Sequence, residues 1–206
     1  MSANLLYPQR EDALAGKPDD FIWRLSVEQY HEIIRAGILT ADDPVELLEG
    51  WLVYKMPKNP QHRIATRLTQ KALEAVVPAG WYVDAQEPIT LEDSEPEPDV
   101  MIARGDTRQY RDRHPGPADL ALVVEVADTT LERDRGMKKR LYARAGIVVY
   151  WIVNLAEGVL EVYTQPSGPI ASPDYLQQQR YALSDNVPVM IEGREVTRLA
   201  VRDLLS

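Results

Sequence analysis

Two long apolar runs, separated by a segment with helical periodicity, constrain the fold of this chain most strongly. Residues 120–126 (LALVVEV) and 147–153 (IVVYWIV) contain one charged residue between them, as expected for strands that are covered on both faces. Residues 131–145 lie between these runs and predict a helix, which Gly146 would end. A strand, a helix and a strand in this order form a β-α-β unit, most simply parallel and right-handed.

The rest of the chain predicts further helices and short strands. Residues 26–29 (SVEQ) have the form of a capping box, which begins a helix. Residues 61–77 predict a second helix, because apolar side chains recur at helical spacing; these are Ile64, Leu68, Ala72 and Ala75. The pair Glu49 and Gly50 joins the apolar runs 45–48 and 51–56 and predicts a β-hairpin. Other strands are expected at 81–85, 88–91, 99–103 and 158–163, and a short final helix at 198–205.

These elements predict an α/β fold class, and more specifically an α+β mixed sheet with helices packed on it. A length of 206 residues suits one domain. The polar segment 1–20 is expected to be poorly ordered, which leaves residues 21–206 as the single domain.

The composition excludes several kinds of protein. The chain contains no Cys, which excludes thiolate zinc sites and a Cys nucleophile and favours a reducing compartment. No run approaches the roughly 18 apolar residues that a membrane-spanning helix needs. The N-terminus lacks the apolar region of a signal peptide. We therefore expect a cytoplasmic protein that does not contact a membrane.

Charge is unevenly distributed along the chain. The net charge of −9 argues mildly against general nucleic-acid binding. Residues 101–144, however, contain ten Lys and Arg against seven Asp and Glu, so the net charge of this segment is +3 and that of the remainder is −12. A phosphate-bearing partner is expected to contact this segment. The alternative is that these charges lie on the solvated faces of a loop and a helix.

Glu125 is the one acid inside the first apolar run. Burying an unpaired carboxylate is costly, so this side chain needs a partner or a cation. Strand alternation places Ala121, Val123 and Glu125 on one face of the strand. A fixed Arg or Lys, or a divalent metal ion, could pair with Glu125. The alternatives are a purely structural ion pair and a strand end that reaches water.

Asp99 begins the strand expected at 99–103. An acid at the start of one strand and an acid inside another can converge on adjacent strands. Two or three carboxylates around a vacancy suit a hard cation such as Mg²⁺ or Mn²⁺. Such an ion polarises a phosphodiester and lowers the pKa of the attacking water. Asp99 could instead be a turn residue that closes the acidic loop before it.

Asp134, Lys138 and Tyr142 are spaced four residues apart, so they lie on one side of the helix that follows the Glu125 strand. From there Lys138 could reach the expected metal site and orient the attacking water, or stabilise charge on the phosphoryl oxygens. The alternative is an ordinary surface pair between Asp134 and Lys138.

Glu46 and His62 are two further candidates. Glu46 stands between apolar neighbours in an expected strand, so it could be a third metal ligand or an edge-strand acid that faces water. His62 opens the second helix, where it could donate to a phosphate or lie at the surface in the first turn.

Five sequence motifs, taken in order, resemble a known family. They are VELLEGWL, NPQH, EPDVMI, LVVEVADTT and DRGMKKRLYARAGIVVYWIVN. The set resembles the Uma-type restriction endonuclease family of the PD-(D/E)XK nuclease superfamily, from about Leu25 to the C-terminus and most strongly over residues 98–154. Each motif alone is weak, whereas the five in this order and at these spacings are fairly specific.

The resemblance implies a restriction-endonuclease-like core with an added N-terminal helix and β-hairpin. It implies that Pro98 and Asp99 form the PD half-motif and that Glu125 is the (D/E) position. Ala127 stands where the superfamily has its lysine. The resemblance implies that Lys138, in the following helix, takes the place of that lysine.

The helical lysine belongs to a D-x-x-x-K-x-x-x-Y pattern, which Asp134, Lys138 and Tyr142 match. Glu46 matches the family's early acidic position and His62 matches its histidine. Many relatives have Ser where this chain has Asp128, so a role for that hydroxyl is not expected here.

The sequence therefore predicts a Mg²⁺- or Mn²⁺-dependent endonuclease that acts on DNA. Asp99, Glu125 and Glu46 would hold the metal ion, Lys138 would position water or a phosphoryl oxygen, and His62 and Tyr142 would line the site. A homodimer is expected, because cutting both strands of a duplex often uses two copies of such a site. The alternatives are a non-catalytic binding or assembly module that retains the nuclease fold and a hydrolase of another phosphate ester.

Overall fold

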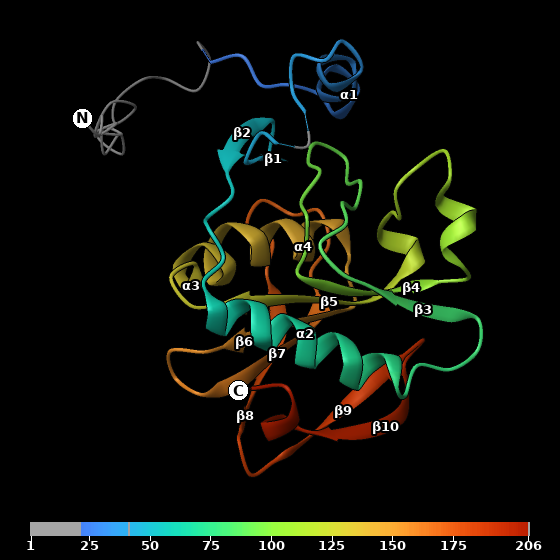
Figure 1. The fold of residues 1–206 in the computed structure, drawn as a ribbon, viewed down its shortest axis with the longest axis vertical. Coiled ribbons are helices and arrows are strands. Elements are labelled where there is room, and N and C mark those ends of the chain that lie inside the picture. The colour runs from blue at the N-terminus through green and yellow to red at the C-terminus, as the bar shows by residue number, and fades with distance from the viewer. Residues whose placement is uncertain (1–21, 41, 206) are drawn as a thin grey trace.

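A six-stranded mixed sheet forms the centre of the molecule in the computed structural model, which describes residues 22–40 and 42–205. The segment 1–20, expected to be poorly ordered, lies outside the described residues. The strand order is β3-β4-β5-β6-β7-β8 (Figure 1). The strands are β3 (Trp81–Asp84), β4 (Val100–Arg104), β5 (Leu120–Ala127), β6 (Val149–Asn154), β7 (Val159–Pro166) and β8 (Tyr175–Ala182).

The predicted β-α-β unit is confirmed at the centre of this sheet. Strands β5 and β6 are parallel, all their residues are buried, and the other neighbouring strands pair antiparallel. The connection consists of α3 (Leu131–Arg133), the π-helical turn η4 (Asp134–Lys138) and α4 (Lys139–Ala145). Gly146 ends it with a φ of 77°, which a residue without a Cβ adopts at little cost.

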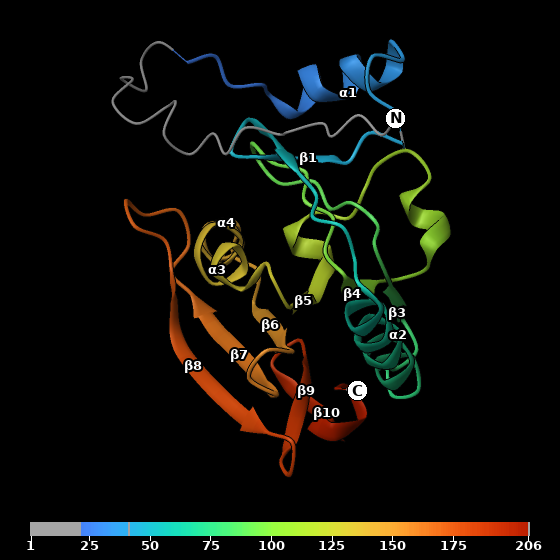
Figure 2. The same cartoon turned by 60° about the vertical axis from the view of Figure 1, so that its left-hand side comes forward.

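Helices cover both faces of the sheet (Figure 2). Helix α2 (Pro60–Glu74) packs Leu73 against the face that carries Val124, and α4 packs Leu141 against the face that carries Val123. Strands β9 (Asn186–Ile191) and β10 (Arg194–Ala200) form a second small sheet on the α2 side. Among the described residues, no helix has the length and apolar character needed to cross a bilayer.

The N-terminal helix and hairpin lie together above the sheet (Figure 1). The capping box of α1 (Val27–Arg35) is confirmed, because Gln29 N–H donates to Ser26 Oγ at 3.2 Å and Ser26 N–H donates to Gln29 Oε1 at 3.0 Å. Strands β1 (Val45–Leu48) and β2 (Trp51–Tyr54) form the predicted hairpin, with Glu49 and Gly50 in the left-handed region.

The buried face of α2 differs from the predicted one. Ile64 is 49% exposed, and the buried side chains are Ala65, Thr66, Thr69 and Leu73. The spacing of apolar residues identified the helix but not which of its faces packs on the sheet. That face carries small Ala and Thr side chains, which let the helix approach the sheet closely. This rotation turns His62 inward, because it lies one helical turn before Thr66.

Strand β5 contains a bulge that the sequence did not predict. Ile102 pairs with Leu122 and Ala103 pairs with Leu120, so Ala121 is an extra residue on β5. The prediction that Ala121 shares a face with Glu125 is wrong, because the bulge turns Ala121 toward the α2 side of the sheet.

Two other predicted elements are wrong. Residues 88–91 form no strand, because Pro88 and the facing Pro96 lack the N–H groups that a ladder needs, although Ile89 N–H still donates to Pro96 O at 3.0 Å. The final helix expected at 198–205 is absent: residues 198–200 end strand β10, which pairs with β9, and a single 3-10 turn (Val201–Asp203) follows.

Candidate active site

Asp99 and Glu125 enter the site from two neighbouring antiparallel strands. Val100 pairs with Val124 across β4 and β5, so Asp99, one residue earlier, lies beside Glu125. The two residues are 5% and 4% exposed, and both line one small pocket. The two acids thus converge on adjacent strands, as the sequence suggested.

Two side chains of the helix after β5 bind the Glu125 carboxylate. Lys138 Nζ donates to Glu125 Oε1 at 2.8 Å, and the Tyr142 hydroxyl donates to the same oxygen at 2.7 Å. Ala127, the position at which the resemblance implies the superfamily's lysine, is fully buried. The ammonium group that contacts Glu125 therefore comes from the helix rather than from the strand.

The π-helical turn η4 carries the inward residues of this helix. Lys139 N–H donates to the carbonyl of Asp134, five residues earlier, where an α-helix would use the residue four earlier. Asp134 and Lys138 are 2% and 3% exposed, so they do not form the surface pair that was one alternative. Thr130 Oγ1 holds the Asp134 carboxylate at 2.6 Å. The sequence predicted the helix but not its π turn.

Negative charge exceeds positive charge around Lys138. Burial raises the pKa of Glu125 above its ordinary value against the attraction of Lys138, and Asp134, Asp99 and Glu46 raise this pKa further. Burial alone would lower the pKa of Lys138, but Glu125, Glu46 and Asp134 outweigh it, so the pKa of Lys138 lies above its ordinary value. Lys138 is therefore an ammonium ion among several carboxylates.

Asp99 is held by a different set of donors. Val126 N–H donates to Asp99 Oδ2 at 2.9 Å, His62 Nε2 lies 3.1 Å from the same oxygen, and Lys58 Nζ lies 3.6 Å from Oδ1. Burial would raise the pKa of Asp99, but these three partners, His62 foremost, lower it below its ordinary value. His62 thus lines the site, as one of the two sequence interpretations held.

Glu46 is buried behind Lys138. It is 1% exposed, its Oε2 accepts from Glu97 N–H at 3.1 Å, and the same oxygen lies 3.5 Å from Lys138 Nζ. The interpretation of Glu46 as a water-facing edge acid is therefore wrong. It does not line the pocket that Asp99 and Glu125 share.

The fit to a metal ion can be judged from the donors themselves. Within residues 22–40 and 42–205, no three His, Cys, Asp or Glu side chains are gathered closely enough to hold a metal ion together. Asp99 and Glu125 nevertheless supply hard oxygen donors to one pocket, and burial together with the nearby carboxylates raises the pKa of Glu125. These residues fit a hard divalent cation held by two carboxylates, with water as its other ligands.

Sequence reasoning missed several residues that line the pocket. Asn59 caps α2 by accepting from His62 N–H at 2.9 Å, and its amide donates to Asp128. An Asn directly before a Pro is a helix N-terminal signal, so Asn59 could have been found from the sequence. Lys58 and Arg133 carry no such signal, because only the fold brings them to the pocket.

Comparison with known proteins identifies a family and a similar solved structure. A solved structure, a putative nuclease belonging to DUF820 from Anabaena variabilis ATCC 29413, superposes with a TM-score of 0.65 at 15% sequence identity, and the match covers 87% of this chain and 97% of that chain. This likeness shows a nuclease-like fold. No curated protein matches the sequence significantly. The Uma2 family, described as "Putative restriction endonuclease", matches residues 27–200, so the chain belongs to this family.

Proposed function

We propose that this protein is a metal-dependent endonuclease that hydrolyses phosphodiester bonds of DNA. One observation carries the proposal: the buried carboxylates of Asp99 and Glu125 line a single pocket, and the Lys138 ammonium lies 2.8 Å from Glu125. Membership of a family described as "Putative restriction endonuclease", and a fold like that of a protein described as a "putative nuclease", support it.

In the proposed mechanism, Asp99 and Glu125 would hold Mg²⁺ or Mn²⁺. The bound ion would polarise the phosphodiester and lower the pKa of the attacking water. Glu46, a candidate ligand from the sequence, has a different proposed role, since its carboxylate lies 3.5 Å from Lys138 Nζ and helps to keep this amine protonated.

The side chains around the carboxylates position the reacting groups. Lys138 donates to a phosphoryl oxygen or to the attacking water and stabilises the negative charge that develops on phosphorus-bound oxygens. Tyr142 fixes the orientation of Glu125, and His62 fixes that of Asp99. The water oxygen forms a bond to phosphorus as the bond to the departing nucleotide oxygen breaks, and that oxygen takes up a proton.

The proposal is tested by the nicking of supercoiled plasmid in Mg²⁺, Mn²⁺ or EDTA. The proteins compared are wild type, Asp99→Asn, Glu125→Gln and Lys138→Met, with Asp112→Asn, an exposed acid outside the pocket, as the control. We expect nicking by wild type and Asp112→Asn that needs the metal ion and is lost in the other three. Equal nicking by Asp99→Asn and wild type would contradict the assignment of the site.

The proposed assembly follows from the cleavage of duplex DNA. A duplex has two strands of opposite direction, so two sites related by a twofold axis can cut both of them. We therefore propose a homodimer. Sedimentation of wild type with and without a short duplex measures this, and a monomer under both conditions would contradict it.

A second candidate function is a non-catalytic binding module that retains the nuclease fold. The observation in its favour is that both acids already have side-chain partners, His62 and Lys58 for Asp99 and Lys138 for Glu125. Calorimetry with Mg²⁺ and Mn²⁺ separates the two functions. Metal binding that Asp99→Asn abolishes favours the enzyme, and DNA binding without any metal binding favours the module.

A further inference from the structure

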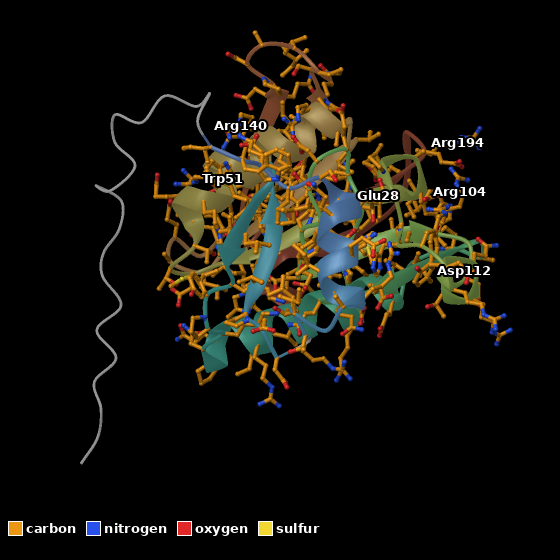
Figure 3. The ribbon with its side chains drawn as sticks, turned by 90° about the horizontal axis from the view of Figure 1, so that it is seen from above. Glu28, Trp51, Arg104, Asp112, Arg140 and Arg194 are labelled. Carbon is orange, nitrogen blue, oxygen red and sulfur yellow. The ribbon has the colours of Figure 1, made fainter. Side chains whose placement is uncertain are left out.

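Most basic residues of segment 101–144 are already neutralised by nearby acids. Arg104 pairs with Glu192 at 2.7 Å and Arg140 with Glu49 at 2.6 Å. Arg104 and Arg140 also lie on opposite sides of the molecule (Figure 3), so the segment does not form one basic surface. Among the described residues, Arg111 and Arg133 are the members of this segment without an ion pair, and only Arg133 lines the candidate active site.

A hydrogen bond to a backbone carbonyl holds the Arg133 side chain at the pocket. It belongs to the short helix α3, and its Nη1 donates to the carbonyl oxygen of Tyr54 on β2 at 2.9 Å. This bond fixes the guanidinium between the hairpin and the helix. The Nε–H of Arg133 is buried and has no hydrogen-bond partner within the described part of the chain. A buried donor without an acceptor is unusual in a folded protein.

Lys58 offers a second cation at the same pocket. Its Nζ lies 3.6 Å from Asp99 Oδ1, beyond an ordinary hydrogen bond, and its side chain is 42% exposed. Such a loosely paired ammonium can exchange its partner for an incoming anion. The pocket therefore holds two acids for a cation and, beside them, two cations without a close acidic partner, Arg133 and Lys58.

We infer that Arg133 binds a backbone phosphate of the nucleic-acid substrate within the active-site pocket, and that Lys58 contacts the same strand. The guanidinium presents donors in a planar fork, which matches the oxygen atoms of a phosphate. This inference rests on the proposed nuclease function, because it assumes that a phosphodiester enters this pocket. It assigns Arg133 to substrate binding and not to the metal ion.

The test measures binding separately from cleavage. Fluorescence anisotropy follows a labelled short duplex in Ca²⁺, which carboxylates bind, over a series of salt concentrations. The variants are Arg133→Gln and Arg133→Lys. The matched control is Arg108→Gln, because Arg108 is an exposed arginine of the same segment that does not line the pocket. A second set of duplexes replaces single phosphates by neutral methylphosphonates.

We expect Arg133→Gln to weaken binding roughly tenfold and to reduce the slope of log K against log salt by about 0.9, the value for one duplex phosphate. Arg108→Gln should leave the slope unchanged. At one methylphosphonate position, wild type and Arg133→Gln should bind equally, because the contact is then missing from both complexes. Arg133→Lys keeps the charge and should keep the slope, with a smaller loss of affinity.

Four outcomes would count against the inference. A slope for Arg133→Gln equal to that of wild type would do so, and so would the same loss of affinity at every methylphosphonate position. If Arg133→Gln unfolds through loss of the Tyr54 hydrogen bond, Arg133→Lys replaces it in the methylphosphonate comparison. A loss of affinity in Arg133→Lys that persists at every methylphosphonate position would count against the contact between Arg133 and a phosphate. Wild type that binds no duplex and nicks no plasmid would overturn the proposed function as well.

Discussion

Lys138 is the residue on which the buried charges of the site depend. Its ammonium lies 2.8 Å from Glu125 and 3.5 Å from Glu46, and the side chain is 3% exposed. A buried ion pair contributes little net stability, because both charges lose their hydration. Removal of one partner is nevertheless costly, since the other charge stays buried without compensation.

We therefore expect Lys138→Met to destabilise the protein by about 3 kcal/mol at neutral pH, even though methionine nearly fills the same volume. Lys139→Met is the matched control, because Lys139 has an exposed partner, Asp174, at 2.9 Å and such pairs contribute at most about 1 kcal/mol. Urea unfolding of both variants gives the free energies of unfolding.

The double variant Lys138→Met with Glu125→Gln separates charge from packing. It should recover part of the lost stability, because the uncompensated carboxylate is also removed. Equal stability of Lys138→Met and Lys139→Met would show that the Glu125 carboxylate does not depend on the ammonium.

At the scale of elements, the β1–β2 hairpin is joined to the N-terminal segment at Gly50. Its φ is +79°, and a Cβ at this position would lie 2.6 Å from the Cβ of Arg24 and 3.1 Å from the Leu25 carbonyl oxygen. Gly80 has a φ of +90°, but a Cβ there would meet nothing within 4 Å. A residue with a Cβ would therefore be strained at either position, but only at Gly50 would the Cβ also meet other atoms.

Gly50→Ala should consequently destabilise the protein more than Gly80→Ala does. In both variants an alanine in the left-handed region costs about 1 kcal/mol of stability. Only in Gly50→Ala must the new Cβ also displace Arg24 and Leu25, which precede α1. Thermal unfolding measures the two losses. Equal losses would mean that the segment at Arg24 and Leu25 moves away without cost.

The π-helical turn is anchored to the sheet by Arg135. Arg135 Nε donates to Glu161 Oε2 on β7 at 3.1 Å, and Asn154 and Tyr163 donate to the same carboxylate at 2.9 and 2.6 Å. Burial would raise the pKa of Glu161, but the hydrogen bonds from Arg135, Tyr163 and Asn154 outweigh it and lower this pKa below 4.5. Arg135 also precedes Gly136 in the turn that carries Lys138.

A carboxyl group whose pKa is lowered by folding stabilises the protein above its unfolded pKa, and this contribution is lost as the pH falls through the folded value. Glu161→Gln should therefore cost roughly 2 kcal/mol at pH 7. The difference from wild type should shrink as the pH falls below 4.5. Chemical unfolding from pH 7 to pH 3 measures this. A difference that is constant with pH would indicate lost packing instead.

At the scale of the whole molecule, metal binding should be coupled to the stability of the fold. A ligand that binds only the folded state raises stability, by about 2.7 kcal/mol at a concentration one hundred times its Kd. Of the proposed ligands, Asp99 directly precedes β4 and Glu125 lies in the neighbouring strand β5, so the ion would bind the folded sheet and not the unfolded chain.

Saturating Mg²⁺ or Mn²⁺ should accordingly raise the Tm by roughly 5 °C, and EDTA should reverse the change. Asp99→Asn should abolish the response, and Asp112→Asn, which changes an acid outside the pocket, should retain it. Differential scanning calorimetry measures all three proteins. An equal rise for Asp99→Asn would place the bound ion elsewhere on the molecule.

Sequence reasoning was most accurate where the signal is local. The capping box at Ser26, the turn at Glu49 and Gly50, and the helix end at Gly146 were all predicted and are observed. Each depends on the conformational preference of a few adjacent residues. The approach of Asp99 to Glu125 was also anticipated, because each acid interrupts or begins an apolar strand and a buried acid needs partners.

The sequence by itself determined the β-α-β unit, because hydrophobic periodicity and chain direction leave few ways to cover two apolar strands. Tertiary structure alone decided the rotation of α2, the bulge at Ala121, the π turn that buries Lys138 and the position of Arg133 at the pocket. In each of these places the local alternatives differ little in energy. Contacts between segments far apart in the sequence, such as Lys138 with Glu46 and Arg133 with Tyr54, select one of them.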